Sequence, residues 1–203
     1  MAIGADLEVV PVQGWRRRQL APDTGLPWVF PSPNMPAFAT ALVYPGQVLW
    51  EGTNISEGRG TTLPFELFGA PFVDPREVQG ALRPADLAGC CLRPLWFEPT
   101  SGKWGGRTCG GFQIHVIDTD LFRPYRTSLA LLQALRILYP EGFAYKAPPY
   151  EYEFERLPMD LLIGDRKVRE GLESGLPVAD LEAAWQDELA DYRQRCSPLF
   201  LYD

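Results

Sequence analysis

EGTNISEGRGTT, residues 51–62, is a polar stretch in which three glycines alternate with two carboxylates, a guanidinium, an amide and four hydroxyls. Mainly apolar segments flank it at residues 41–50 and 63–68. Because glycine tolerates positive φ and close backbone approach, the polar side chains between the glycines can converge on one small volume. An ordinary solvated loop has the same composition. Two interpretations therefore stay open: a binding loop held between buried segments, or a surface loop.

Composition limits the classes of protein to which the chain can belong. With 203 residues, of which 46% are hydrophobic and 22% charged, the chain can bury a core and is not disordered as a whole. Its 20 prolines and 19 glycines predict short elements and many turns. The net charge is -7 and the only basic run is RRR at residues 16–18, which argues against nucleic-acid binding. No apolar run has the length of a membrane span.

No metal site and no cofactor are predicted. The four cysteines have neither the density of a disulfide scaffold nor the paired spacing of a zinc site. His115 is the only histidine, and it lies in the apolar strand pattern FQIHV, where a buried core histidine is the alternative to a functional one. The glycines of residues 51–62 match neither a phosphate-binding loop nor a nucleophile elbow.

The order of elements predicts an α+β fold, with a small mixed or antiparallel sheet packed by several helices. Helical spacing of apolar residues, together with caps, predicts helices at residues 37–44 (capped by Asn34), 74–82, 121–139 (capped by Asp120), 165–172 and 179–195. Strands are expected at residues 92–98 and 111–117. The last two helices are expected to pack on the sheet. Asp6–Val12 is expected to be a strand buried on both faces of a parallel sheet.

Several motifs resemble one family along nearly the whole chain. They are PSPNMP at residues 31–36, TALVYPG at 40–46, the polar stretch at 51–62, PFELFGAP at 64–71, GGFQIHV at 110–116, FRP at 122–124 and LFLY at 199–202. Together they resemble the NamZ/YbbC-like family of bacterial exo-β-N-acetylmuramidases. The resemblance covers only part of the family's length, because the N-terminal Rossmann-like half with its Glu-His-Gly motif has no counterpart in this sequence.

The resemblance implies an organisation and a function. Residues 1–46 would be the tail of the α/β Rossmann-like domain, and residues 47–203 a C-terminal α+β domain. The implied function is part of a peptidoglycan exo-β-N-acetylmuramidase. This glycoside hydrolase removes N-acetylmuramic acid from the non-reducing end of cell-wall fragments in cell wall turnover and muropeptide recycling. The alternative is a non-catalytic carbohydrate-binding or accessory module left after loss of the N-terminal half.

Site residues follow from the implied reaction. Glycosidic hydrolysis usually uses paired carboxylates, so Glu51 and Glu57 are the catalytic candidates. Arg59 would either clamp the lactyl carboxylate of N-acetylmuramic acid or form a structural ion pair with Glu57. The other substrate-binding candidates offer a hydrogen bond or a ring face to the sugar: Asn54, Ser56, Thr61, Trp50 and His115. Trp50 suits the core equally well.

Partners and location are expected only in outline. The resemblance implies a cell-wall saccharide containing N-acetylmuramic acid, together with either a separate N-terminal half or a second copy of the chain. Family members are often exported to the periplasm or the extracellular space. Residues 1–12 lack the basic region of a signal peptide, so the sequence leaves the localisation open.

Overall fold

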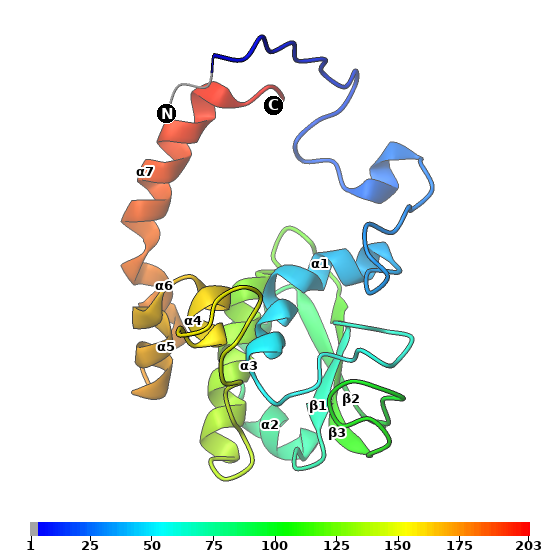
Figure 1. Ribbon diagram of the computed structural model, residues 1–203, viewed down its shortest axis with the longest axis vertical. Helices are drawn as coiled ribbons and strands as arrows, with labels where there is room; N and C mark the ends of the chain where they lie inside the picture. The colour runs from blue at the N-terminus through cyan, green and yellow to red at the C-terminus, as the bar shows by residue number, and fades with distance from the viewer. Residues whose placement is uncertain (1–3) are drawn as a thin grey trace. The chain divides into compact units, whose positions relative to one another are not determined.

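The structure, a computed structural model, describes residues 4–203, and these form two compact units (Figure 1). Unit 1 combines the residues up to Val29 with Trp185–Asp203, and unit 2 is Phe30–Ala184. The polar stretch at residues 51–62 lies wholly within unit 2. No helix of the described residues has the length and apolar character needed to cross a membrane.

Unit 2 is built on a three-stranded antiparallel sheet with the order β1-β3-β2. β2 (Cys90–Phe97) and β3 (Cys109–Val116) pair from Cys90 opposite Val116 to Phe97 opposite Cys109. They confirm the predicted antiparallel pair, although each begins two residues earlier than expected. β1 (Leu67–Ala70) was not predicted as a strand, because its four residues are all buried and lack the alternation that marks a half-exposed strand. The predicted α+β fold class is confirmed.

Helices α1 (Phe38–Gln47) and α3 (Pro124–Leu138) pack against each other, and α1 also contacts β3 (Figure 1). α2 (Pro75–Ala81) packs on α3, β2 and β3. The apolar core between these elements includes side chains that are at most 1% exposed: Trp50, Phe65, Phe68, Phe112, Leu129, Leu132 and Leu135. The three leucines lie on the buried face of α3. The predicted domain boundary at residue 46 lies inside α1.

Two helices begin later than predicted. α3 begins at Pro124 with Arg123 at its N-cap, so the start at Leu121 with Asp120 as the cap is wrong. The reason is a turn before the helix, in which Asp118 Oδ1 accepts hydrogen bonds from the backbone N–H groups of Asp120 and Leu121 at 2.9 and 3.0 Å. α1 likewise begins after Ala37, without a side-chain cap, rather than being capped by Asn34.

The C-terminal helices of unit 2 do not pack on the sheet as predicted. α4 (Pro158–Ile163) contacts α5 (Arg166–Glu173), and both α5 and α6 (Val178–Ala184) pack on α3. The predicted helix at residues 179–195 is two helices, because the chain leaves helical geometry at Trp185 before α7 (Gln186–Cys196). α7 belongs to unit 1 and has no buried residue.

The predicted strand at Asp6–Val12 is wrong. This segment is irregular, and its apolar side chains lie in solvent, with Leu7 79% and Val10 82% exposed. A strand buried on both faces needs neighbouring strands, and no strand of the described residues pairs with this segment. Unit 1 is instead held by contacts with the C-terminal residues, such as the Arg17 guanidinium 3.7 Å from the ring centroid of Phe200.

The α1–α3 contact depends on a glycine. At Gly46, a Cβ atom would lie 2.0 Å from the carbonyl oxygen of Pro124 and 2.5 Å from Ser128 Oγ. We therefore expect Gly46→Ala to lower the free energy of unfolding by about 1–3 kcal/mol, through overpacking. Gly80→Ala is the matched control: a Cβ there meets nothing within 4 Å, and alanine favours the helix by up to about 1 kcal/mol. Urea denaturation of both variants tests the expectation, and a neutral Gly46→Ala would contradict it.

Candidate functional site

The polar loop (residues 51–62) is held in place by two other segments of unit 2. The backbone N–H of Asn54 donates to the Ala144 carbonyl at 2.9 Å, and the Asn54 carbonyl accepts from Trp104 Nε1 at 2.6 Å. The first two residues of the loop belong to η2 (Val48–Gly52), a short 3-10 helix that packs on α4. These bonds support the interpretation of residues 51–62 as a fixed loop on a rigid scaffold.

Two of the three loop glycines have the left-handed conformation that glycine tolerates. Gly58 has φ +77° and Gly60 has φ +82°. A side chain at either position would also collide with backbone, because a Cβ would lie 2.7 Å from the Leu67 carbonyl oxygen at Gly58 and 2.4 Å from that of Ser101 at Gly60. Glycine at these positions lets the loop turn while it stays packed against β1 and the turn at residues 101–106.

The polar loop forms one wall of an open pocket of about 300 Å³. The lining combines three carboxylates, three cations and a phenol: Glu51, Glu57, Glu151, Arg59, Lys103, Lys146 and Tyr150. Three of these residues come from the polar loop, one from the turn at residues 101–106 and three from the segment at residues 146–151. Of the predicted site residues, the structure brings Glu51, Glu57 and Arg59 together.

Glu51 uses both of its carboxylate oxygens. Oε1 accepts a hydrogen bond from Arg59 Nη2 at 2.6 Å, and Oε2 accepts one from the Tyr150 hydroxyl at 2.8 Å. Burial and the contact with Glu51 raise the pKa of Tyr150. The Tyr150 hydroxyl therefore keeps its proton at neutral pH and serves as a donor that fixes Glu51.

Glu57 is the more deeply buried of the two predicted carboxylates, with its side chain 7% exposed. Its Oε2 accepts from Lys103 Nζ at 2.9 Å, and the same ammonium donates to the carbonyl oxygens of Trp50 at 2.6 Å and Ile55 at 3.1 Å. All three protons of the ammonium thus have acceptors. Burial lowers the pKa of Lys103, and the Glu57 carboxylate opposes that shift.

The expected ion pair between Arg59 and Glu57 is not the main contact of either residue. Arg59 Nε lies 3.8 Å from Glu57 Oε1, whereas its Nη2 lies 2.6 Å from Glu51 Oε1. The close partner of Glu57 is Lys103. The loop therefore carries two separate pairs, Arg59 with Glu51 and Lys103 with Glu57.

Three predicted sugar-binding residues have structural partners instead and do not line the pocket. Asn54 bridges to the segment at residues 142–144, since its Nδ2 donates to the Gly142 carbonyl and its Oδ1 accepts from the Ala144 N–H. Ser56 is 1% exposed and its Oγ accepts from the Gly58 N–H. Thr61 Oγ1 donates to the Gly58 carbonyl. These side chains shape the loop.

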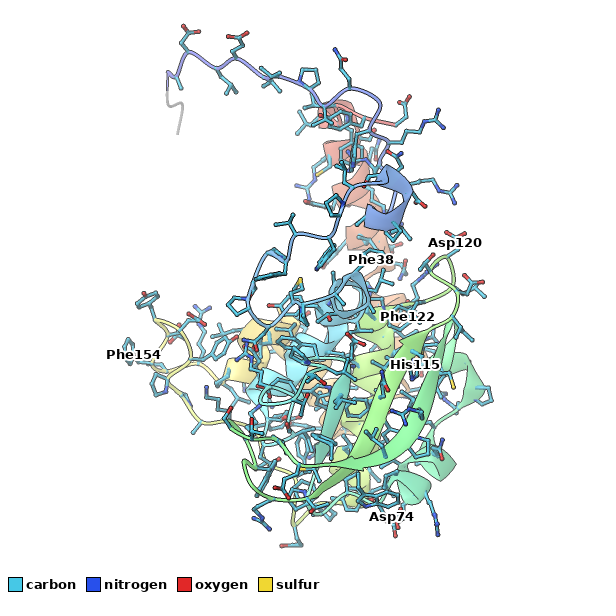
Figure 2. All side chains as sticks on the ribbon, turned by 90° about the vertical axis from the view of Figure 1, so that its right-hand side faces the viewer. Phe38, Asp74, His115, Asp120, Phe122 and Phe154 are labelled. Atoms are coloured by element: carbon cyan, nitrogen blue, oxygen red, sulfur yellow. The ribbon has the colours of Figure 1, made fainter. Side chains whose placement is uncertain are left out.

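Trp50 and His115 are not part of the pocket either. Trp50 is fully buried, stacks on Phe68 at 5.2 Å between ring centroids and donates from Nε1 to Gln47 Oε1 at 2.8 Å, so it belongs to the core. His115 lies opposite Cys91 on β3 and is exposed (Figure 2), so it is neither a pocket residue nor a core histidine. The outward face of β3 carries it because the inward positions of the strand are filled by Phe112 and Ile114.

Sequence reasoning missed four residues that line the pocket: Lys103, Lys146, Tyr150 and Glu151. Lys103 lies in a glycine-rich turn, and the other three lie in an irregular run rich in tyrosine and proline. One signal was available in the sequence: lysine is rare in this chain, and Lys103 and Lys146 are two of its three lysines. A second is visible only in the structure: Glu151 has φ +52°, a strained value for a residue other than glycine.

No metal centre is visible in unit 1 or unit 2, since residues 4–203 contain no group of three or more His, Cys, Asp or Glu side chains that could hold an ion. The four cysteines are free. The chemistry available in the pocket is that of carboxylates, ammonium and guanidinium groups and a phenol.

The chain matches known proteins along its whole length. The family described as exo-beta-N-acetylmuramidase NamZ, C-terminal, matches residues 42–202, and the N-terminal family of the same name matches residues 1–39. The peptidoglycan beta-N-acetylmuramidase NamZ of Bacillus subtilis (strain 168) is 38% identical over 201 residues, which are 99% of this chain and 47% of that protein. The chain thus spans about half the length of this curated relative.

Solved structures share the fold. A DUF1343 family protein of Bacteroides fragilis NCTC 9343 aligns with a TM-score of 0.80 and 25% identity, over 94% of this chain and 49% of that one. A second DUF1343 family protein of the same organism aligns with a TM-score of 0.53 and 24% identity, over 85% and 43% of the two chains, and supports the fold alone. Because the match to the C-terminal family covers residues 42–202, the chain belongs to the NamZ exo-β-N-acetylmuramidase family.

Proposed function

We propose that this chain is the C-terminal part of a peptidoglycan exo-β-N-acetylmuramidase. It would act on N-acetylmuramic acid at the non-reducing end of cell-wall fragments. The observation that carries the proposal is the pocket, in which Glu51 and Glu57 are fixed by separate donors inside the region that the C-terminal family matches. Carboxylates in an open polar pocket are the groups that glycoside hydrolysis usually uses.

We assign different roles to the two carboxylates because their hydrogen bonds differ. Both oxygens of Glu51 accept bonds, from Arg59 and Tyr150, so this group anchors the pocket wall. Glu57 has one oxygen bound to Lys103, while no hydrogen-bond donor among the described residues reaches its Oε1. We therefore assign to Glu57 Oε1 the role of base for water or of nucleophile.

Neither Glu51 nor Glu57 is the proton donor for the leaving oxygen in this assignment. The Tyr150 hydroxyl donates its hydrogen bond to Glu51, and the Lys103 ammonium donates to three acceptors. We assign the donor to the N-terminal half of the family, since this chain spans 47% of the Bacillus relative and carbohydrate sites commonly lie between domains. A second copy of the chain is the other candidate, and it would make turnover by the chain alone rise more steeply than its concentration.

The test is turnover of a chromogenic N-acetylmuramide by the purified chain, with and without the N-terminal half of the Bacillus subtilis relative. We expect at least about 100-fold stimulation by the added half, because an incomplete constellation of catalytic groups loses rate steeply. Glu57→Gln should then lower the stimulated rate by about 10²–10⁴-fold. Glu141→Gln changes an exposed carboxylate outside the pocket in the same way and should have no effect.

Other outcomes separate the alternatives. Full turnover by the chain alone would place the proton donor within this sequence. Saccharide binding without turnover, even with the added half, would favour the accessory carbohydrate-binding module.

A further inference from the structure

The pocket contains three cations, and two of them are already neutralised. Arg59 Nη2 lies 2.6 Å from Glu51 Oε1. Lys103 Nζ lies 2.9 Å from Glu57 Oε2 and also donates to two backbone carbonyls. Because a carboxylate already offsets each of these charges, neither attracts a further anion as strongly as an unpaired cation would.

Lys146 is different. It lines the pocket and is exposed, and its ammonium makes no ion pair with any carboxylate in the part of the chain that the structure describes. The contact that orients it is with an aromatic ring, since Lys146 Nζ lies 5.3 Å from the ring centroid of Tyr150. That ring is itself fixed by the hydrogen bond of the Tyr150 hydroxyl to Glu51.

The backbone of Lys146 is fixed beside the polar loop as well. Its N–H donates to the Gly52 carbonyl at 2.9 Å, and the neighbouring Tyr145 forms a bridge with Thr53. The side chain therefore starts from a rigid position and ends in an unpaired charge at the rim of the pocket. A cation that is pre-positioned and unpaired loses little on binding an anion.

We propose that Lys146 binds the carboxylate of an acidic sugar and thereby sets the preference of the pocket for that sugar. The proposal rests on the proposed function, in which the substrate is N-acetylmuramic acid, whose lactyl ether carries a carboxylate that N-acetylglucosamine lacks. Three carboxylates also line the pocket, Glu51, Glu57 and Glu151, and they repel an anionic ligand unless a free cation faces it.

This inference moves the clamp that the sequence predicted from Arg59 to Lys146. The charge of Arg59 is already offset by Glu51 at 2.6 Å, whereas that of Lys146 is not offset by any carboxylate of the described residues. Moving Arg59 away to hold a ligand would leave the Glu51 carboxylate, which is 14% exposed, with Tyr150 as its remaining donor. Arg59 is therefore a residue that positions Glu51. A single ammonium recognises a carboxylate as a point charge rather than through two parallel bonds.

Titration calorimetry with N-acetylmuramic acid and N-acetylglucosamine tests the proposal. Lys146→Met should weaken binding of the acidic sugar by about 10-fold and leave binding of the neutral sugar unchanged. Lys146→Arg should retain the preference. Lys167→Met removes an exposed lysine outside the pocket and is the matched control. Equal losses for the two sugars in Lys146→Met, or a preference that disappears in Arg59→Ala and survives in Lys146→Met, would overturn the proposal.

A second measurement separates this inference from the proposed function. Lactate carries the same carboxylate without the sugar, and we expect it to shift the amide resonances of residues 146, 147, 150 and 151 in the wild-type chain and in Lys167→Met. The shifts should be absent in Lys146→Met. Lactate binding of this kind, combined with no binding of either sugar, would keep the anion site and reject the muramidase assignment. An unchanged lactate response in Lys146→Met would reject the anion site whatever the sugars do.

Discussion

Replacing Lys103 by methionine is expected to lower the free energy of unfolding by about 3–5 kcal/mol. The methionine fills a similar volume but removes the donor to Glu57 Oε2 and to the carbonyls of Trp50 and Ile55. Glu57, with its side chain 7% exposed, would then be a buried carboxylate whose nearest cation is 3.8 Å away, on Arg59. Urea denaturation at neutral pH measures the loss, and Lys167→Met is the control.

A double-mutant cycle tests whether the loss comes from the pair. In Lys103→Met, the buried Glu57 carboxylate loses its ammonium partner. If this unpaired charge causes the loss of stability, then the double variant Glu57→Gln/Lys103→Met should be more stable than Lys103→Met alone. Purely additive losses would show that Lys103 stabilises the loop through the two carbonyls, independently of Glu57. The cycle thus decides whether Lys103 is a positioning residue for the proposed base.

Local signals in the sequence predicted much of the fold. The side chains of Asp74 and Asp165 each accept from the backbone N–H two residues later, at 2.8 Å, and so begin α2 and α5 as their sequence positions predict. β2 and β3 pair antiparallel across the glycine-rich turn at residues 101–106. These features depend on residues close in sequence, where capping and alternation are decisive.

The pairs that build the pocket could not be predicted in this way. Lys103 and Glu57 are 46 residues apart, and Tyr150 and Glu51 are 99 apart. No periodicity or capping pattern relates positions at such separations in a single sequence. The same limit explains the wrong strand at Asp6–Val12, because an apolar run predicts burial without specifying which strand it would pair with.

The backbone contacts of the small polar residues could not be predicted for a different reason. Ser56 and Thr61 accept or donate within two or three residues along the chain, which is how hydroxyl side chains stabilise turns. The sequence shows that hydroxyls are present in a glycine-rich loop, but not whether they face the backbone or a ligand. In this loop the charged side chains line the pocket, and the hydroxyls hold the loop in shape.

Leu132→Ala is expected to destabilise the chain by about 2–5 kcal/mol. Leu132 is fully buried in α3, the helix that packs on α1, α2, α5 and α6, so truncation removes apolar contacts and leaves a cavity at the centre of unit 2. Ile137→Ala is the matched control on the same helix, because Ile137 is 60% exposed. That variant should change the free energy of unfolding by no more than about 0.5 kcal/mol.

The comparison with Glu57→Gln separates stability from function. Glutamine keeps an oxygen that can accept from Lys103, so we expect a loss of about 1 kcal/mol, well below that of Leu132→Ala. The effects on saccharide turnover should be reversed. Glu57→Gln should be nearly inactive, and the folded fraction of Leu132→Ala should turn over substrate at nearly the wild-type rate. If Glu57→Gln instead lowers the melting temperature as much as Leu132→Ala does, Glu57 is a structural partner of Lys103. The base must then be sought at Glu51 or Glu151, the other carboxylates of the pocket.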